Sequence, residues 1–249
     1  MMKKFVAVVL ALALALSMTA VAMAETLVMC TNASFPPYEF VEGDDFAGID
    51  VEIFRALCEK LGYEPQIDDM EFSACIPAVQ SGKADVALGA ITVTEERAQL
   101  INFSDSYASG VQVIIVREDS EITSLDDLYV EGKNWQIGVQ TATTGDIYAL
   151  DDFDGKTGTV LEYQTGNEAA MALAAGKIDC VIIDSDPAKN YVAANEGLKI
   201  LETAYTTEDY AIVVAKEHTE LLDAINAALA EMKADGTIDA IVAKYITAE

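Results

Sequence analysis

The sequence predicts an α/β fold built as one large domain or two closely joined lobes, and three observations support this prediction. Apolar, often β-branched segments alternate with segments of helical periodicity along the 249 residues, which indicates layers of helices on mainly parallel sheets. The length suffices for one large domain or for two lobes of about 100 residues each. No Pro- or Ser-rich linker divides the chain, so two lobes would be joined by strands rather than by a flexible tether.

The N-terminus has the layout of a secretory signal peptide. Two lysines precede an apolar run at residues 5–16, and small residues follow up to Ala24 with an A-x-A pattern at 22–24. A membrane anchor is the alternative, because this segment is long enough to span a bilayer. The shortness of its strongly apolar part favours cleavage after Ala24. We therefore expect residues 1–24 to be a signal peptide and the exported protein not to insert into the membrane.

The first half of the mature chain is predicted to contain a strand at 26–31, helices at 49–61 and 72–80, a strand at 85–91, a helix at 94–100 and a strand at 111–116. The first helix carries an apolar stripe and ends at Gly62. The second is predicted despite Pro77. Glu95 and Glu96 occupy the first turn of the third helix, where acidic side chains complement the helix dipole.

The second half repeats the alternation. Strands are predicted at 135–139, 159–163, 180–183 and 210–215, and helices after residue 143 or 144 and at 168–175, 186–194, 220–234 and 238–245. Thr143 or Thr144 is the expected cap of the first of these helices. Gly176 ends the second. Asp186 is the expected cap of the third, whose first turn tolerates Pro187.

The charge balance is strongly acidic, with 15 basic and 42 acidic residues and a formal net charge of −27. Such a surface repels nucleic acid and anionic lipid, so neither is an expected partner. The simplest interpretation is a well-solvated surface. A preference for cationic ligands is the alternative, but net charge does not describe a pocket.

The cysteines do not indicate a metal site. Cys30, Cys58, Cys75 and Cys180 form no C-x-x-C pair, and the single histidine, His218, is near none of them in sequence. Export would permit disulfides in three possible pairings. Each cysteine lies in an apolar pattern, however, which favours small buried side chains without disulfides. No metal or other cofactor is expected.

Several motifs occur in order along the chain: TNASFPPYEF at 31–40, GIDVE at 48–52, IPAVQSGKAD at 76–85, ITVTEER at 91–97, NFSDSY at 102–107, VQTATTG at 139–145, AAGKID at 174–179 and MKADGT at 232–237. Together they resemble the polar amino-acid-binding proteins of bacterial ABC importers, known as solute-binding protein family 3. The resemblance spans the mature chain.

The resemblance implies a two-lobed type II periplasmic-binding fold. Lobe 1 would combine residues 25–110 and 207–249, and lobe 2 would comprise residues 111–206. Two crossing strands would form the hinge, and the ligand would lie in the cleft between the lobes. Such proteins are monomeric and act in the periplasm or elsewhere outside the cytoplasm, where they deliver a free amino acid to the importer's permease subunits.

A free amino acid needs partners for its carboxylate and its ammonium group. Arg97, after the I-T-x-T motif, matches the family's carboxylate-binding arginine, and its planar fork suits two parallel hydrogen bonds; the alternative is a solvated helix arginine. Thr92 and the backbone at Ala90 would complete this site, with Thr141 and Thr144 from a turn that opens a helix. On its own, that turn is a weak signal.

Asp184 is the candidate for the ammonium group, because it follows a buried strand at its C-terminal end; helix capping is the alternative. Phe35 and Phe72 match family positions that stack on the ligand side chain. Asn32 and Gln140 are expected to set ligand preference together with Phe35. Family members that bind basic amino acids often have Asp where Asn32 stands, and an amide cannot offset a buried cation. A neutral polar ligand is therefore expected.

Binding would close the hinge, because the ligand bridges the two lobes and so favours the closed form. Two other functions are compatible with the sequence. The same fold hosts periplasmic dehydratases of cyclohexadienyl acids, and Glu39 could approach the cleft, although the lone His218 disfavours a Ser-His-Asp or Cys-His arrangement. A detached sensory binding module is the second alternative, since no membrane-spanning segment follows the binding motifs.

Overall fold

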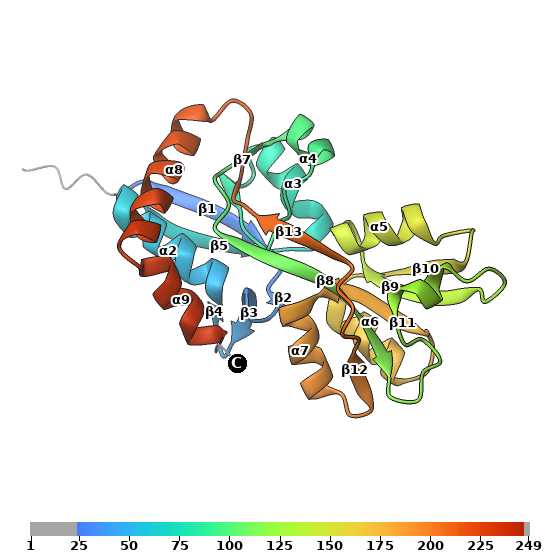
Figure 1. Cartoon of the computed structure of the whole chain (residues 1–249). Helices are drawn as coiled ribbons and strands as arrows, with labels where there is room; N and C mark the ends of the chain where they lie inside the picture. Colours follow the sequence, from blue (N-terminus) through green and yellow to red (C-terminus); the bar gives the residue numbers. More distant parts are fainter. Residues whose placement is uncertain (1–23, 247–249) are drawn as a thin grey trace, which may run out of the picture.

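The structure, a computed structural model, describes residues 24–246, and all of the predicted signal peptide except Ala24 lies outside the described residues. Figure 1 shows two lobes, each built on its own sheet and joined by two long strands. An α/β fold is confirmed, but the sheets are mixed rather than mainly parallel. The chain crosses from one lobe to the other and later returns, so the strands at these crossings run antiparallel to their neighbours.

The first lobe contains a five-stranded sheet in the order β5-β1-β6-β14-β7, in which β14 alone runs against the other four strands. The strands are β1 (Thr26–Thr31), β5 (Glu64–Asp69), β6 (Val86–Ala87), β7 (Asn102–Phe103) and β14 (Val213–Val214). A small antiparallel sheet of β2 (Ser34–Phe35), β3 (Glu39–Glu42) and β4 (Asp45–Ala47) belongs to the same lobe.

Helices cover both faces of the five-stranded sheet. They are α2 (Ile49–Leu61), α3 (Phe72–Gln80), α4 (Glu95–Leu100), α8 (Thr219–Ala234) and α9 (Thr237–Tyr245). Side chains of β1 alternate between the faces: Leu27 and Met29 join the core with α2 and α8, whereas Cys30 packs with Cys75 of α3. This alternation is the period of two expected of a strand that is buried on both faces.

The second lobe contains a six-stranded sheet in the order β10-β9-β11-β8-β12, with β13 also paired to β8. Its elements are β8 (Ala108–Arg117), η1 (Leu125–Tyr129), β9 (Trp135–Gln140), α5 (Thr144–Asp152), β10 (Gly158–Tyr163), α6 (Gly166–Ala174), β11 (Cys180–Asp184), α7 (Ser185–Ala194), β12 (Leu198–Ile200) and β13 (Thr206–Tyr210). One face packs on α6 and α7 and the other on α5.

The strands β8 and β13 join the lobes. They pair antiparallel from Ala108 opposite Tyr210 to Gln112 opposite Thr206, and both run from one lobe toward the other (Figure 1). The predicted lobe boundaries, 110/111 and 206/207, fall within this strand pair and stay a prediction.

The strand predictions differ from the structure in several places, the first being the predicted strand 85–91, of which only Val86–Ala87 is a strand (β6). The predicted strand 210–215 is interrupted, because β13 ends at Tyr210 in one sheet and β14 begins at Val213 in the other. Strand β5 was not predicted, because it is a largely exposed edge strand that contains Pro65 and lacks an apolar pattern. In the last two cases the neighbouring sheet decides the conformation.

Within residues 24–246, no helix combines the length and apolarity needed to cross a bilayer. The four cysteines all lie in this described part, where they are buried and not disulfide-bonded. The same residues contain no group of three or more His, Cys, Asp or Glu side chains arranged to hold a metal ion.

Candidate ligand-binding site

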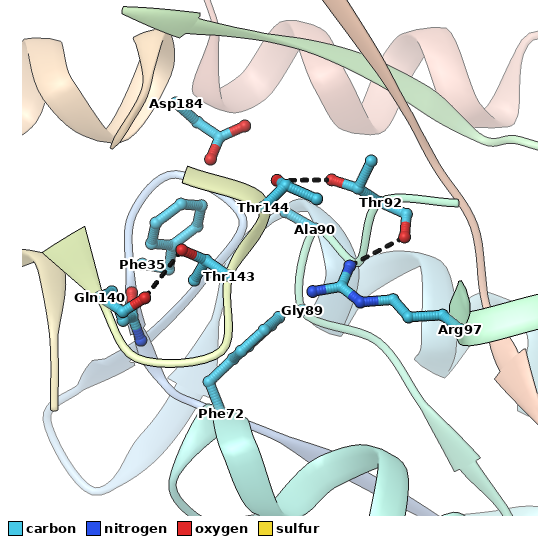
Figure 2. A pocket seen from close by; sticks show the side chains of 10 residues that line it. All are labelled: Phe35, Phe72, Gly89, Ala90, Thr92, Arg97, Gln140, Thr143, Thr144 and Asp184. Carbon is cyan, nitrogen blue, oxygen red and sulfur yellow. Dashed lines mark hydrogen bonds between the residues drawn. The ribbon is translucent and has the colours of Figure 1, made fainter. Parts of the chain in front are cut away.

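A small cavity lies between the lobes. Figure 2 shows the residues that line it, which come from both lobes: Phe35, Phe72, Gly89, Ala90, Thr92, Arg97, Gln140, Thr143, Thr144 and Asp184.

Arg97 reaches the cavity from α4 and is 7% exposed. It donates from Nη1 to the carbonyl of Thr92 (2.8 Å) and from Nη2 to the carbonyl of Ala142 in the other lobe (2.9 Å). Its guanidinium lies 5.8 Å from the centre of the Phe72 ring. Burial lowers the pKa of Arg97 while the charge of Glu208 opposes that shift. Its other three N–H groups have no acceptor among the described residues and can bind an anion.

The N-terminus of α5 faces Arg97 across the cavity. Thr143 caps the helix, with its hydroxyl accepting from the backbone N–H of Asp146 (3.3 Å). The N–H groups of Thr144 and Gly145 are in the first turn, where a helix has no internal acceptor for them. Free N–H groups and the positive end of the helix dipole favour an anion here.

Asp184 ends strand β11 and is 7% exposed. It accepts hydrogen bonds from Gln112 Nε2 (2.8 Å) and from the hydroxyl of Tyr210. No lysine or arginine among the described residues lies within ion-pair distance of it. Burial, and next the charge of Glu208, raise the pKa of Asp184 to about 7. A buried carboxyl without a cationic partner is suited to receive one from a ligand.

The expected cap of α7 was wrong. Asp184 occupies the N-cap position but makes no side-chain capping bond, and Asp186 lies inside the first turn. The carboxylate of Asp186 instead accepts from the hydroxyl of Tyr38 in the other lobe (3.1 Å) and pairs with Lys189 (3.2 Å).

The remaining walls are aromatic or uncharged. Phe35 and Phe72 line the cavity, as does Gln140. Gln140 Nε2 donates to Asn32 Oδ1 (3.0 Å) and to the carbonyl of Gln164 (3.2 Å), whereas its Oε1 is buried with no partner among the described residues. That oxygen is an available acceptor for a ligand N–H.

Two predicted site residues do not line the cavity. Asn32 Oδ1 accepts from the lining residue Gln140, and Asn32 Nδ2 donates to the carbonyl of Met70 (2.9 Å). The Thr141 hydroxyl donates to the carbonyl of Tyr163 (3.0 Å), away from the cavity. The other eight predicted residues all line it.

Ala90 has a positive φ of 48°, which is unusual for a residue with a side chain. Its N–H donates to Asp50 Oδ2 (2.8 Å), which also accepts from the Tyr107 hydroxyl (2.7 Å). Burial raises the pKa of Asp50 to about 6. Glu39 is buried beside Asp50 and does not line the cavity. Glu39, which the dehydratase alternative expects near the cleft, is therefore not among the residues that line it.

The sequence motifs missed some residues of this site. Gly89 and Thr143 line the cavity, and Thr143 was considered only as a helix cap. Gln112, Glu208 and Tyr210 lie behind the lining on the two joining strands. No local pattern marks these three, because the pairing of β8 with β13 brings them to the site.

Comparison with known proteins identifies the family. The family of bacterial extracellular solute-binding proteins, family 3, matches residues 27–248. The chain belongs to this family. A similar relative is the "Arginine-binding extracellular protein ArtP" of Bacillus subtilis (strain 168), which is 31% identical over 234 residues, 90% of this chain and 87% of the relative.

Solved structures resemble this family 3 protein closely. An ancestral arginine-binding protein bound to arginine is 37% identical, with a TM-score of 0.84 over 90% of this chain and 99% of that one. An ancestral arginine-binding protein bound to glutamine is also 37% identical, with a TM-score of 0.83 over 91% and 100% of the two chains. The two-lobed fold is thereby confirmed.

Proposed function

We propose that this protein captures a free amino acid outside the cytoplasm and delivers it to the permease of an ABC importer. One observation carries the proposal: Arg97 from one lobe and Asp184 from the other border the same small cavity, and neither has an ion-pair partner among the described residues. An amino-acid zwitterion supplies both partners. Membership of the solute-binding family supports delivery to an importer.

The carboxylate of the ligand would bind the free N–H groups of Arg97 and the N-terminus of α5, and its ammonium group would bind Asp184. Because these groups come from two lobes, the ligand favours the closed form by its difference in affinity for the two forms. The permease would recognise that closed shape. No bond of the ligand is made or broken.

We propose a neutral polar side chain for the ligand. Arg97 and Asp184 are the only charged residues in the cavity lining, and the zwitterion uses both. The side-chain end then offers Phe35, Phe72 and the unpartnered Gln140 Oε1 but no second carboxylate among the described lining residues, so a buried cationic side chain would lack a counter-charge. The relative named for arginine and the ancestral arginine-binding proteins solved with arginine and with glutamine make arginine the main competitor.

The test uses residues 25–249, stripped of ligand by partial unfolding and refolding, and melted with each of the twenty standard amino acids. A ligand at 100 times its Kd adds about 2.7 kcal/mol, a rise in Tm of about 5–10 °C for a chain of this size. We expect such a rise with one or a few neutral polar amino acids. Mass spectrometry of the recovered ligand should find it unchanged.

Arg97→Ala should weaken binding by at least about a hundredfold, because it leaves the ligand carboxylate buried and unpaired. Arg55→Ala is the matched control, since Arg55 is half-buried, does not line the cavity, and bonds to Asp45 and to the carbonyl of Phe46. If no amino acid raises the Tm, the proposed function is wrong. If arginine binds at least tenfold more tightly than every neutral amino acid, the proposed ligand preference is wrong and the function stands.

A further inference from the structure

Two carboxyl groups are buried close together at the cavity wall, where the joining strands meet β11. Asp184 lines the cavity, whereas Glu208 of β13 is 5% exposed and does not line it. Gln112 of β8 donates from the same Nε2 atom to Asp184 Oδ2 (2.8 Å) and to Glu208 Oε2 (3.1 Å). Burying an acid this deeply beside another acid costs folding free energy, and such a cost is expected where the buried acid serves a function.

The hydrogen atoms in this cluster can be assigned from chemistry. A carboxylate only accepts, so the Thr92 hydroxyl, 2.9 Å from Glu208 Oε2, donates its single hydrogen to it. Thr92 Oγ1 can then only accept from other groups, and in its 3.4 Å contact with Thr144 the donor is Thr144. Both hydrogens of Gln112 Nε2 are likewise used by the two carboxylates.

We propose that Glu208 is a positioning residue for the ligand's ammonium group. By holding the hydroxyl hydrogen of Thr92, it turns a lone pair of that oxygen toward the cavity, beside the carboxylate of Asp184. Through Gln112 it fixes Asp184 from the strand pair that joins the lobes. This inference rests on the proposed function, because it assumes that the ligand carries an ammonium group.

The electrostatics agree with this role. Glu208 is the second-largest cause, after burial, of the raised pKa of Asp184, and it is the acid that most strongly supports the positive charge of Arg97. Its Oε1 is buried without a hydrogen-bond partner among the described residues. The other titratable groups whose charges interact with Asp184 are Tyr38, Glu39, Arg97, Tyr148, Tyr191 and Tyr210.

The first arm of the test needs no ligand. Carboxyl ¹³C NMR follows the titration of Asp184 in the stripped protein, in Glu208→Gln and in Asp209→Asn. Asp209 is the next residue of β13 and is exposed, so its variant removes the same charge without entering the cluster. Glu208→Gln should lower the pKa of Asp184, and Asp209→Asn should leave it unchanged. An unchanged pKa in Glu208→Gln would overturn the proposal.

The second arm measures binding by calorimetry at pH 8.5, where Asp184 is ionised in every variant, with the tightest-binding of the twenty amino acids. Glu208→Gln should weaken binding about tenfold to a hundredfold, the range for a hydrogen bond to a charged group. Asp209→Asn should stay within about twofold of the unmodified protein.

A double-mutant cycle separates positioning from general damage. If Glu208 acts through Thr92, then Glu208→Gln should cost much less in the Thr92→Val background than alone. Fully additive losses would overturn the proposal while leaving the proposed function intact. If none of the twenty amino acids binds the unmodified protein, the proposed function fails, and the NMR arm alone decides whether Glu208 acts on Asp184.

Discussion

Asp184 shows how burial sets the behaviour of one residue. Its pKa of about 7 means that the empty site holds a proton below neutral pH. A ligand ammonium group requires the ionised form, so binding must displace that proton. Binding should therefore depend on pH in a range where most carboxylates are already ionised.

Affinity should rise as pH increases from 5.5 to about 7.5 and then level off. Below pH 7, affinity should fall by up to about tenfold for each pH unit, because the ionised fraction of Asp184 falls by that factor. Calorimetry from pH 5.5 to 8.5 measures this profile. Asp184→Asn should bind weakly with a flatter profile, and an equally steep profile in that variant would assign the dependence to another group.

The raised pKa of Asp184 has the opposite consequence for the stability of the empty protein, which falls as pH rises while affinity increases. Asp184 and Asp50 both have raised pKa values, so between about pH 4 and pH 7 the folded state binds more protons than the unfolded state does. Each group therefore destabilises the ligand-free fold as pH rises through this window, and a ligand that pairs with Asp184 removes part of that cost.

At the scale of elements, helices α5 and α6 both begin with a threonine N-cap, but only the cap of α5 lines the cavity. Thr143 caps α5 and Thr165 caps α6, and each hydroxyl accepts from a backbone N–H three residues later, at 3.3 and 3.2 Å. Only Thr143 lines the cavity. The pair separates helix stability from ligand binding.

Thr143→Ala and Thr165→Ala should each reduce the free energy of unfolding by about 1 kcal/mol, the usual value of an N-cap. Only Thr143→Ala should also weaken amino-acid binding, because the N-terminus of α5 is presented to the ligand carboxylate. Urea denaturation and calorimetry measure the two quantities. Equal loss of affinity in both variants would contradict an anion site at α5.

At the scale of the whole molecule, contacts between the lobes outside the cavity contribute to closure. The Tyr191 hydroxyl of α7 donates to the carbonyl of Ser34 in β2 (2.7 Å), and the Tyr38 hydroxyl reaches Asp186. These bonds exist only when the lobes approach each other. They should shift the balance toward the closed form and thereby raise the apparent affinity.

Tyr191→Phe removes one of these bonds and should weaken binding by about threefold to tenfold, the equivalent of one neutral hydrogen bond. Small-angle X-ray scattering of the stripped protein should show a larger radius of gyration than in the unmodified protein. Tyr129→Phe is the control, because Tyr129 bonds to Asp152 within one lobe. A control that weakens binding as much would show that the effect is not one of closure.

The sequence by itself determined the elements with a strong local signal. The bounds of β1, α2 and α3 agree with the predicted ranges residue for residue, because apolar periodicity and terminal glycine or serine residues act locally. The ordered motifs identified the family, and with it Arg97 and Asp184 as opposite sides of one cavity.

Only the tertiary structure decided what depends on residues far apart in sequence. It placed Asn32 and Thr141 outside the cavity lining, ended β13 at Tyr210 and placed Asp186 against the other lobe. It also brought Glu208 within hydrogen-bond distance of Thr92, 116 residues earlier in the chain. Strand pairing and contacts between the lobes set these positions, and no local sequence pattern encodes them.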